Sequence, residues 1–360
     1  MRVLMLPGDK GGCGLYRMVM PGRSVAKAYP DDEIFAADGI NGKASRDRWG
    51  RVTVHAIPPI DADVVVFQRP LNDDLAACIP LIQAQGVAVV VEFDDDFRNA
   101  DPRNMAASKV HPATSPASNY EILERAASIA DLVTVSTPSL LRYARHGRAR
   151  VIRNYVPESL LTVLHSEEKP LRVGWTGTIA THPDDLTITR LGVASALEYT
   201  GAHMVVVGDG QGVSQQLGLS HEPVCITGWV DMQRYPETVA QNIDIGIVPL
   251  AKTLFNEAKS YLKGLEFAAI GIPFIATPTQ EYRILTDAGA GLLANKTKDW
   301  HKLLHSLISD DDFRAEESAR GKQVVRDQFT IEQHVHEWHD AWEQAMVNRA
   351  MARRTHASVG

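Results

Sequence analysis

Residues 255–273 have the sequence FNEAKSYLKGLEFAAIGIP, and this is the most informative stretch of the chain. Four small or apolar residues in it recur at spacings of four, three and four, which predicts a helix that buries one face: Ala258, Leu262, Leu265 and Ala269. We expect one helix over 257–270, followed by a strand at 273–276.

Four polar residues of this stretch, Asn256, Lys259, Lys263 and Glu266, form a second stripe on the predicted helix. Two lysines four positions apart repel each other by a few tenths of a kcal/mol, and an anion would relieve that repulsion. We expect Asn256 to cap the helix, and the first-turn amides, Lys259 and Ser260 to bind a diphosphate. Glu266 suits a pair of vicinal hydroxyls, as in a ribose, because an ionised carboxylate only accepts hydrogen bonds. The alternative is a solvated helix face.

Around this stretch, short runs of Val, Ile and Leu alternate with helical patterns, which is typical of parallel strands buried on both faces. The strand-like runs of the first half are 3–6, 63–67, 87–93 and 132–136, and its helical patterns are 16–28, 73–84 and 118–130. In the second half the strand-like runs are 171–175, 203–207, 223–226, 243–248 and 273–276, with helical patterns at 184–199 and 257–270. The sequence therefore predicts an α/β chain with two parallel sheets.

The chain has 360 residues, a length that favours two domains. We expect domains at 1–155 and 171–329, joined by a polar, proline-containing linker at 156–170. The segment 330–360 begins with Thr330 as a helix cap and carries Trp338 and Trp342 on one face. It predicts a long helix packed on its own domain or across the linker, with a frayed tail.

Composition excludes several classes of protein. Hydrophobic residues make up 44% and charged residues 22%, as in ordinary globular chains. The 37 basic and 44 acidic residues give a net charge of −7, which argues against a global attraction to nucleic acid or an anionic membrane. Cys13, Cys78 and Cys225 are few and widely spaced, which argues against disulfides and zinc. The apolar run 1–6 is too short for a signal peptide, so we expect a cytoplasmic protein.

Glycines follow the predicted strands in both halves. The run 8–14, GDKGGCG, lies between a strand and a helix, where the amides of Gly12 and Gly14 can approach a phosphate or a sugar. Its spacing fits neither the dinucleotide-binding fingerprint nor the P-loop, and a plain tight turn is the alternative. Arg17 either reaches back toward this loop or forms a surface ion pair.

In the second half, Gly177, Thr178 and Gly208 follow strands, and His182 and Asp184-Asp185 precede the next helix. Loops at the carboxyl ends of parallel strands build ligand sites, so we expect these loops to converge on a pocket.

The second half resembles the donor-binding half of GT-B glycosyltransferases, especially glycosyltransferase family 4, the glycosyl transferases group 1. The resemblance rests on Gly228-Trp229-Val230, residues 245–250, Lys259-Ser260, Leu265-Glu266 and Gly271–Pro273. It implies two Rossmann-like domains facing across a cleft, with the nucleotide-sugar donor on the C-terminal domain, the acceptor on the N-terminal one, and a terminal helix that crosses back to the first domain.

The resemblance also implies roles for individual residues. Glu266 would hold the ribose, and Lys259 and Ser260 would face the diphosphate. The full set of expected donor-binding residues is Gly12, Gly14, Arg17, Gly177, Thr178, Gly208, Trp229, Asn256, Lys259, Ser260, Lys263 and Glu266. Two departures stand out. First, Ala258 replaces a family glutamate that contacts the donor sugar, so either Asn256 or Glu257 substitutes for it or the sugar contacts differ. Second, the loop after Gly177 lacks the Arg and Lys that bind the diphosphate in the family. Lys259 would then neutralise more of the diphosphate charge, and Arg153 would assist it.

The acidic run 92–96 and a histidine are candidates for chemistry in the first half. Asp94 to Asp96 resemble a metal-binding motif of GT-A enzymes, but the two-domain pattern favours GT-B, which implies no metal. They either orient the acceptor hydroxyl or cap the next segment and pair with Arg98 and Arg103. The catalytic candidates are therefore Lys259, Asp95 and His111, although a lone loop histidine is often merely exposed.

A basic run between Arg142 and Arg153 permits two interpretations, a nucleic-acid contact or an arginine-rich helix end.

The expected function is the transfer of a sugar from a UDP- or GDP-sugar to a hydroxyl acceptor by a hexosyltransferase (EC 2.4), which by resemblance is retaining and metal-independent. No permanently bound cofactor is expected. The acceptor is open: a glycan, protein, lipid, small molecule or DNA base. The alternatives are a nucleotide-sugar epimerase of the same fold and a binding module that has lost catalysis.

Overall fold

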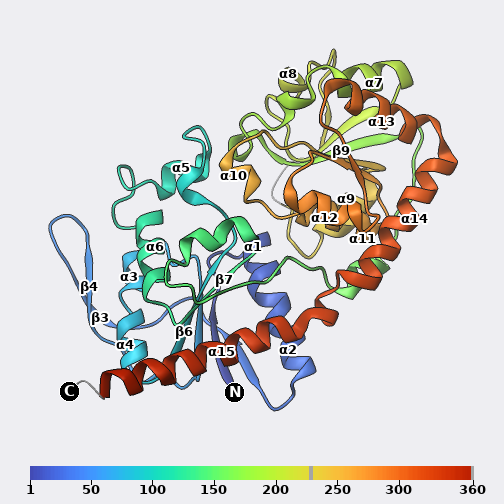
Figure 1. Cartoon of the computed structure of the whole chain (residues 1–360). Coiled ribbons are helices and arrows are strands. Elements are labelled where there is room, and N and C mark those ends of the chain that lie inside the picture. Colours follow the sequence, from blue (N-terminus) through green and yellow to red (C-terminus); the bar gives the residue numbers. More distant parts are fainter. Residues whose placement is uncertain (227–229, 358–360) are drawn as a thin grey trace. The chain divides into compact units, whose positions relative to one another are not determined.

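The computed structural model describes residues 1–226 and 230–357. The chain forms two compact units (Figure 1). The first comprises Met1–Asn154 and the C-terminal segment from Ile331, and the second comprises Tyr155–Thr330. Among the described helices, none combines the length and the apolar character needed to cross a bilayer.

The first unit contains a six-stranded parallel sheet with the order β2-β1-β5-β6-β7-β8. The strands are β1 (Arg2–Leu6), β2 (Glu33–Ala36), β5 (Val64–Gln68), β6 (Ala88–Phe93), β7 (Leu132–Val135) and β8 (Ala149–Val151). The central strands β5 and β6 are buried along their whole length, as their valine-rich runs predict. All four strands predicted in this half are present.

The helices of the first unit surround this sheet. They are α1 (Gly12–Gly14), α2 (Met20–Ala28), α3 (Asp73–Ala76), α4 (Ile79–Ala84), α5 (Met105–Val110), α6 (Tyr120–Ile129) and α15 (Ile331–Ala357), with a π-helical turn η1 (Leu15–Val19) and 3₁₀ turns η2 (Phe97–Asn99) and η3 (Pro138–Tyr143). The terminal helix α15 packs on α2 and β6, and it buries Trp338 and Trp342. The side chain of Asn348 donates to the carbonyl of Asp131, 2.8 Å away, which ties α15 to the start of β7.

The second unit contains another six-stranded parallel sheet, with the order β11-β10-β9-β12-β13-β14. Its strands are β9 (Arg172–Thr178), β10 (His203–Asp209), β11 (Val224–Ile226), β12 (Ile245–Val248), β13 (Phe274–Ala276) and β14 (Leu292–Leu293). Its helices are α7 (Gly192–Thr200), α8 (Val213–Leu217), α9 (Tyr235–Asn242), α10 (Leu254–Glu257), α11 (Leu262–Ile270), α12 (Gln280–Asp287), α13 (Thr297–Ser309) and α14 (Asp311–Gln328), with 3₁₀ turns η4 (Glu158–Thr162), η5 (Ile179–Thr181) and η6 (Leu186–Thr189). All five strands predicted in this half are present.

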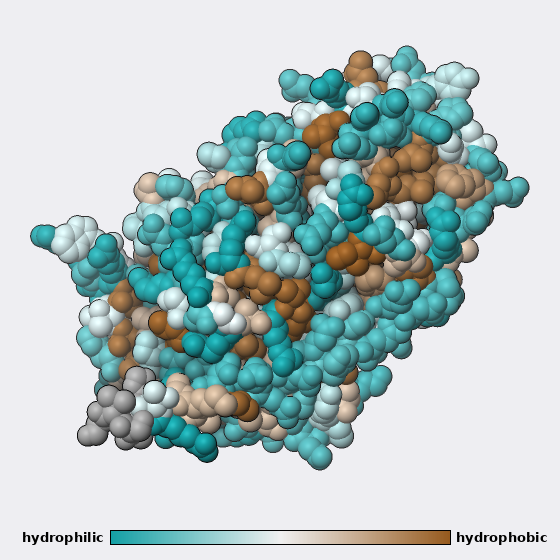
Figure 2. Space-filling model, viewed as in Figure 1, coloured by the Kyte–Doolittle hydropathy of each residue, from teal (hydrophilic) through white to brown (hydrophobic). Residues whose placement is uncertain are grey.

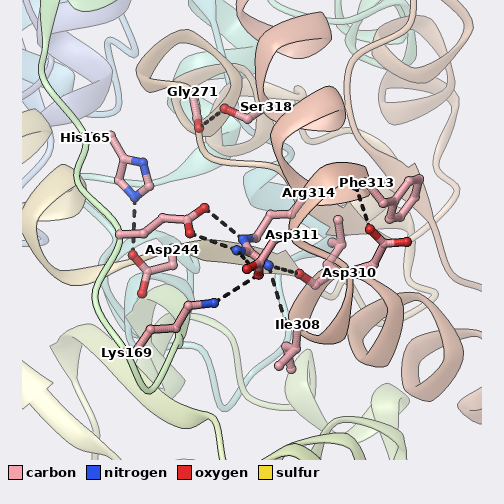
Figure 3. Close-up of polar contacts among 12 residues, drawn as sticks. His165, Lys169, Asp244, Gly271, Ile308, Asp310, Asp311, Phe313, Arg314 and Ser318 are labelled. Carbon is pink, nitrogen blue, oxygen red and sulfur yellow. Dashed lines mark hydrogen bonds and ion pairs between the residues drawn. The ribbon is translucent and has the colours of Figure 1, made fainter.

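The segment 156–170 lies within the second unit. Arg314 of α14 is buried and holds both carboxylate oxygens of Glu167 at 2.8 Å. Figure 3 shows Arg314 next to Asp311. Lys169 pairs with Asp311 at 3.0 Å, and a ring nitrogen of His165 lies 3.0 Å from the carbonyl of Ile243. These contacts fasten the segment to the second sheet and to α14.

An antiparallel hairpin, β3 (Lys43–Arg46) and β4 (Val52–Ala56), follows β2. It projects from the first unit (Figure 1), and Figure 2 shows mostly hydrophilic residues over its tip. The sequence did not predict it, because neither strand carries a buried apolar run.

Candidate functional site

The carboxyl ends of β9 and β10 approach each other closely in the second unit. Gly177 and Gly208 are register partners on these strands, with φ of +147° and +139°, values that L side chains rarely adopt. A Cβ on Gly208 would lie 2.2 Å from the carbonyl oxygen of Gly177, and a Cβ on Gly177 would lie 3.2 Å from Nζ of Lys263. Glycine at both positions therefore keeps this edge of the sheet open beside the lysine.

Lys263 lies in the first turn of α11 and is half-buried at this edge. Its Nζ donates to the carbonyl of Thr176 at 2.6 Å and lies 3.4 Å from Nε2 of His182 and 5.6 Å from the centre of the Trp175 ring. Burial, followed by the positive charge of Lys259, lowers the pKa of Lys263 to about 8. The amine is therefore mostly charged at neutral pH, and the charge is lost just above it.

His182 links this lysine to a buried carboxylate. Its Nδ1 lies 2.7 Å from Oδ2 of Asp185, whose Oδ1 accepts from the backbone of Ala251 at 2.8 Å and from the side chain of Asn256 at 2.6 Å. Burial and the neighbouring Lys263 lower the pKa of His182 to about 4, so the imidazole is neutral at pH 7. Burial alone would raise the pKa of Asp185, but the bonds from His182 and from the backbone of Ala251, together with the charge of Lys259, hold that pKa below the usual value.

The prediction of one helix over 257–270, with Asn256 as its cap, is wrong. The segment forms two helices, α10 and α11, separated by residues 258–261. Thr253 caps α10 by accepting from the backbone of Asn256 at 3.1 Å. The amide of Asn256 instead donates to Asp185 and to the carbonyl of Ala251, and such side-chain bonds compete with a continuous helix. The four polar residues thus do not share one helical stripe.

The other residues expected to bind the donor lie around this edge. Lys259, in the turn between α10 and α11, has its Nζ 4.4 Å from the centre of the Phe255 ring, and the neighbouring Ser260 is half-buried. Glu266 is buried on α11, one turn beyond Lys263. Thr178 accepts from the backbone of Ala180 at 3.2 Å. Trp229 lies outside the described residues.

Two members of this cluster, His182 and Asp185, were not among the predicted site residues. Their sequence signal is their place in the loop after β9, one of the loops expected to converge on a pocket. The contacts that join them to Lys263 and Asn256 come from segments about 70 to 80 positions away.

In the glycine loop of the first unit, the side chain of Asp9 accepts hydrogen bonds from the loop's own backbone amides. Oδ1 of Asp9 accepts from the amides of Gly11 at 2.7 Å and Gly14 at 3.2 Å. A Cβ on Gly14 would lie 1.9 Å from the carbonyl oxygen of Asp9, so only glycine fits there. Gly12 is half-buried in the single-turn helix α1.

Arg17 forms a buried ion pair below this loop, so the expected alternative of a surface ion pair is wrong. The guanidinium is 2% exposed, and it donates to Glu92 and to the carbonyl of Ile152, both at 2.7 Å. Glu92 also accepts from the hydroxyl of Thr134. Burial raises the pKa of Glu92 to about 7, although the charge of Arg17 opposes this shift.

The acidic run after β6 is bound mainly by basic and phenolic side chains: Asp94 binds Arg69, and Asp96 binds Arg142 and Tyr143. Of the two arginines expected to pair with the run, Arg98 binds Glu124 and Arg103 binds Asp101. Asp95 is half-buried, with a carboxylate oxygen 4.0 Å from the guanidinium of Arg69.

His111 is exposed at the end of α5, where its Nδ1 accepts from the backbone of Ala113 at 3.1 Å. Among the described residues, three side chains on α15 lie close enough together to hold a metal ion: His339, Asp340 and Glu343. In that group the ring of His339 already stacks on Tyr29 and pairs with Asp32 at 3.2 Å.

The basic run between Arg142 and Arg153 makes ion pairs and helix-end contacts within the first unit. Arg148 donates to the carbonyls of Ala130 and Asp131, directly after α6, as expected for an arginine at a helix end. Arg145 approaches Glu124 at 3.9 Å.

The comparisons with known proteins concern first the unit that holds the Lys263 cluster. Residues 171–310 match the family model described as glycosyl transferases group 1. This segment, 140 of the 360 residues, is similar to that family. A comparison with curated proteins finds no match.

Solved structures with the GT-B fold resemble nearly the whole chain. HepE (Alr3699) from Anabaena, crystallised with UDP-glucose, is 14% identical, with a TM-score of 0.58 over 95% of this chain and 100% of that one. A glycosyltransferase from Rickettsia africae is 10% identical, with a TM-score of 0.63 over 96% and 98%. Sucrose-phosphate synthase from Thermosynechococcus elongatus is 13% identical, with a TM-score of 0.55 over the full length of both chains. The fold of this chain is therefore GT-B.

Proposed function

We propose that this protein transfers a sugar from a nucleotide diphosphate sugar to a hydroxyl acceptor. The observation that carries the proposal is the match of residues 171–310 to group 1 glycosyltransferases, in the unit where Lys263 lies beside Gly177 at the sheet edge. Because HepE was crystallised with UDP-glucose, UDP-sugars are the first donors to test.

In this proposal the second unit binds the donor. Lys263, Lys259 and Ser260 contact the diphosphate, and Glu266 accepts hydrogen bonds from the ribose hydroxyls. Positive charge at the diphosphate stabilises the leaving group as the glycosidic bond to the donor breaks. The reaction retains the anomeric configuration and proceeds without a divalent metal, as the likeness to GT-B enzymes implies. Asp95 and His111 of the first unit serve the acceptor.

The experiment is a transfer assay with UDP-glucose, UDP-galactose and UDP-N-acetylglucosamine against a mixed panel of hydroxyl acceptors, with and without EDTA. Acceptor-dependent release of UDP supports the proposal. An isomerised nucleotide sugar without acceptor would indicate an epimerase instead, and binding without turnover would indicate a module that has lost catalysis.

A matched pair of variants ties the activity to the site. Lys263→Met should reduce turnover strongly, because it removes the charge at the sheet edge. Lys302→Met, which removes an exposed lysine on α13 of the same unit, should leave it unchanged. Equal turnover in both variants would contradict the proposed diphosphate site.

A further inference from the structure

The ammonium of Lys263 has three N–H bonds, and two of them have acceptors. One is the carbonyl of Thr176 at 2.6 Å, and the other is Nε2 of His182 at 3.4 Å. Within residues 1–226 and 230–357 these are its two hydrogen-bond partners, so one N–H bond has no protein acceptor there. Because Lys263 is half-buried and Gly177 has no side chain, an anion can reach that bond.

The second acceptor exists only in one tautomer of His182. Asp185 Oδ2 lies 2.7 Å from Nδ1, and an ionised carboxylate can only accept, so Nδ1 carries the hydrogen and Nε2 presents its lone pair to Lys263. Asp185 is itself held by the amide of Ala251 and the side chain of Asn256. The carboxylate therefore determines which nitrogen of the ring faces the lysine.

The charged groups around Lys263 have opposite effects on its positive charge. Lys259 disfavours its charge, whereas Asp185 and Glu266 favour it. His182 is neutral and contributes a lone pair without a net charge, so it can orient the ammonium without neutralising it. Full positive charge then remains for a ligand.

We propose that Asp185 and His182 are positioning residues that hold the ammonium of Lys263 with its third N–H bond directed at the diphosphate of the nucleotide sugar. This inference rests on the proposed function and adds the residues that orient its diphosphate-binding lysine.

Calorimetric binding of inorganic pyrophosphate, UDP and uridine tests the inference. His182→Leu removes the lone pair, whereas His182→Gln offers an amide oxygen near the position of Nε2. We expect His182→Leu to weaken pyrophosphate and UDP binding about tenfold, the loss of about one hydrogen bond to a charged group, with uridine binding unchanged. His182→Gln should recover most of that affinity.

Asp185→Asn provides an independent test. Its amide nitrogen can donate to Nδ1, which moves the ring hydrogen to Nε2 and points a donor at the ammonium. We expect this nearly isosteric variant to weaken pyrophosphate binding at least as much as His182→Leu, while it leaves uridine binding intact.

Several outcomes would overturn the inference: equal binding by His182→Leu and His182→Gln, loss of uridine binding in parallel with UDP, or failure of the unmodified protein to bind pyrophosphate. The proposed function fails separately, if the protein binds pyrophosphate and UDP as expected but transfers no sugar to any acceptor.

Discussion

Donor binding should weaken as the pH rises from 7 to 9, because Lys263 loses its charge in that range. Its pKa of about 8 results from burial and from Lys259. A lowered lysine pKa means that the ammonium is present below pH 8 and is lost above it. The charged fraction falls from about 0.9 at pH 7 to about 0.1 at pH 9. If the neutral amine does not bind the diphosphate, the Kd for UDP rises about tenfold over the two pH units.

Calorimetry in two buffers of different ionisation enthalpy measures this effect directly. Binding should take up about 0.1 proton at pH 7, about 0.5 at pH 8 and about 0.9 at pH 9, as UDP restores the ammonium. The terminal phosphate of UDP contributes little at pH 8 and 9, because its second ionisation lies near pH 6; about a tenth of it is still protonated at pH 7.

Two controls accompany the measurement. Uridine carries the base without the diphosphate, so its Kd corrects for ionisation of the base. Lys263→Arg keeps its charge at every pH used, and its UDP binding should lose the pH dependence. The reasoning is refuted if the Kd of the unmodified protein changes less than about twofold, or if Lys263→Arg retains the full dependence.

Three further predictions concern other residues. Glu266→Ala should weaken binding of both uridine and UDP about tenfold or more, because two hydroxyls lose a charged acceptor; an unchanged uridine Kd in titration calorimetry would remove Glu266 from the ribose site. Gly14→Ala should lower the free energy of unfolding by about 2 kcal/mol in urea titrations, because its Cβ would lie 1.9 Å from the carbonyl of Asp9; a loss below about 0.5 kcal/mol would show that the loop adjusts. Glu92 holds its proton up to about pH 7 in the folded chain, against a usual value of 4.5, so the free energy of unfolding should fall as the pH rises from 4.5 to 7, by up to about 3 kcal/mol. Glu92→Gln should remove that part of the slope, and parallel pH profiles for both proteins would contradict the shift.

The central strands were predictable because burial on both faces requires continuous apolar runs. Val64 to Phe67 and Ala88 to Val91 are such runs, and each forms a buried strand. The edge strands β2, β8 and β14 were missed because they are short and at best half-buried, so no apolar pattern marks them. The hairpin of β3 and β4 was missed for the same reason.

Site residues were predictable where a local sequence pattern marks them. They were not predictable where contacts between distant segments of the chain determine their role. Gly177 and Gly208 lie near the ends of β9 and β10, shortly after apolar runs, and Lys263 precedes a glutamate at helical spacing, so each carried a signal in the sequence. The break between α10 and α11 had no such signal, because it depends on Asn256 bonding to Asp185 rather than on helix propensity. The role of His182 depends on Lys263, 81 positions away, which only the folded chain brings within reach.

The division of the chain has a consequence for its synthesis. The second unit is a continuous segment inserted into the first, which is completed only when α15 emerges and covers α2 and β6. The backbone of Val156 donates to the carbonyl of Phe329 at 3.1 Å, so the two ends of the insertion lie next to each other. If the inserted unit folds during translation, the start of α15 lies close to the end of the first segment of the first unit. Docking α15 then costs less loop-closure entropy than it would across 176 unfolded residues (Tyr155 to Thr330).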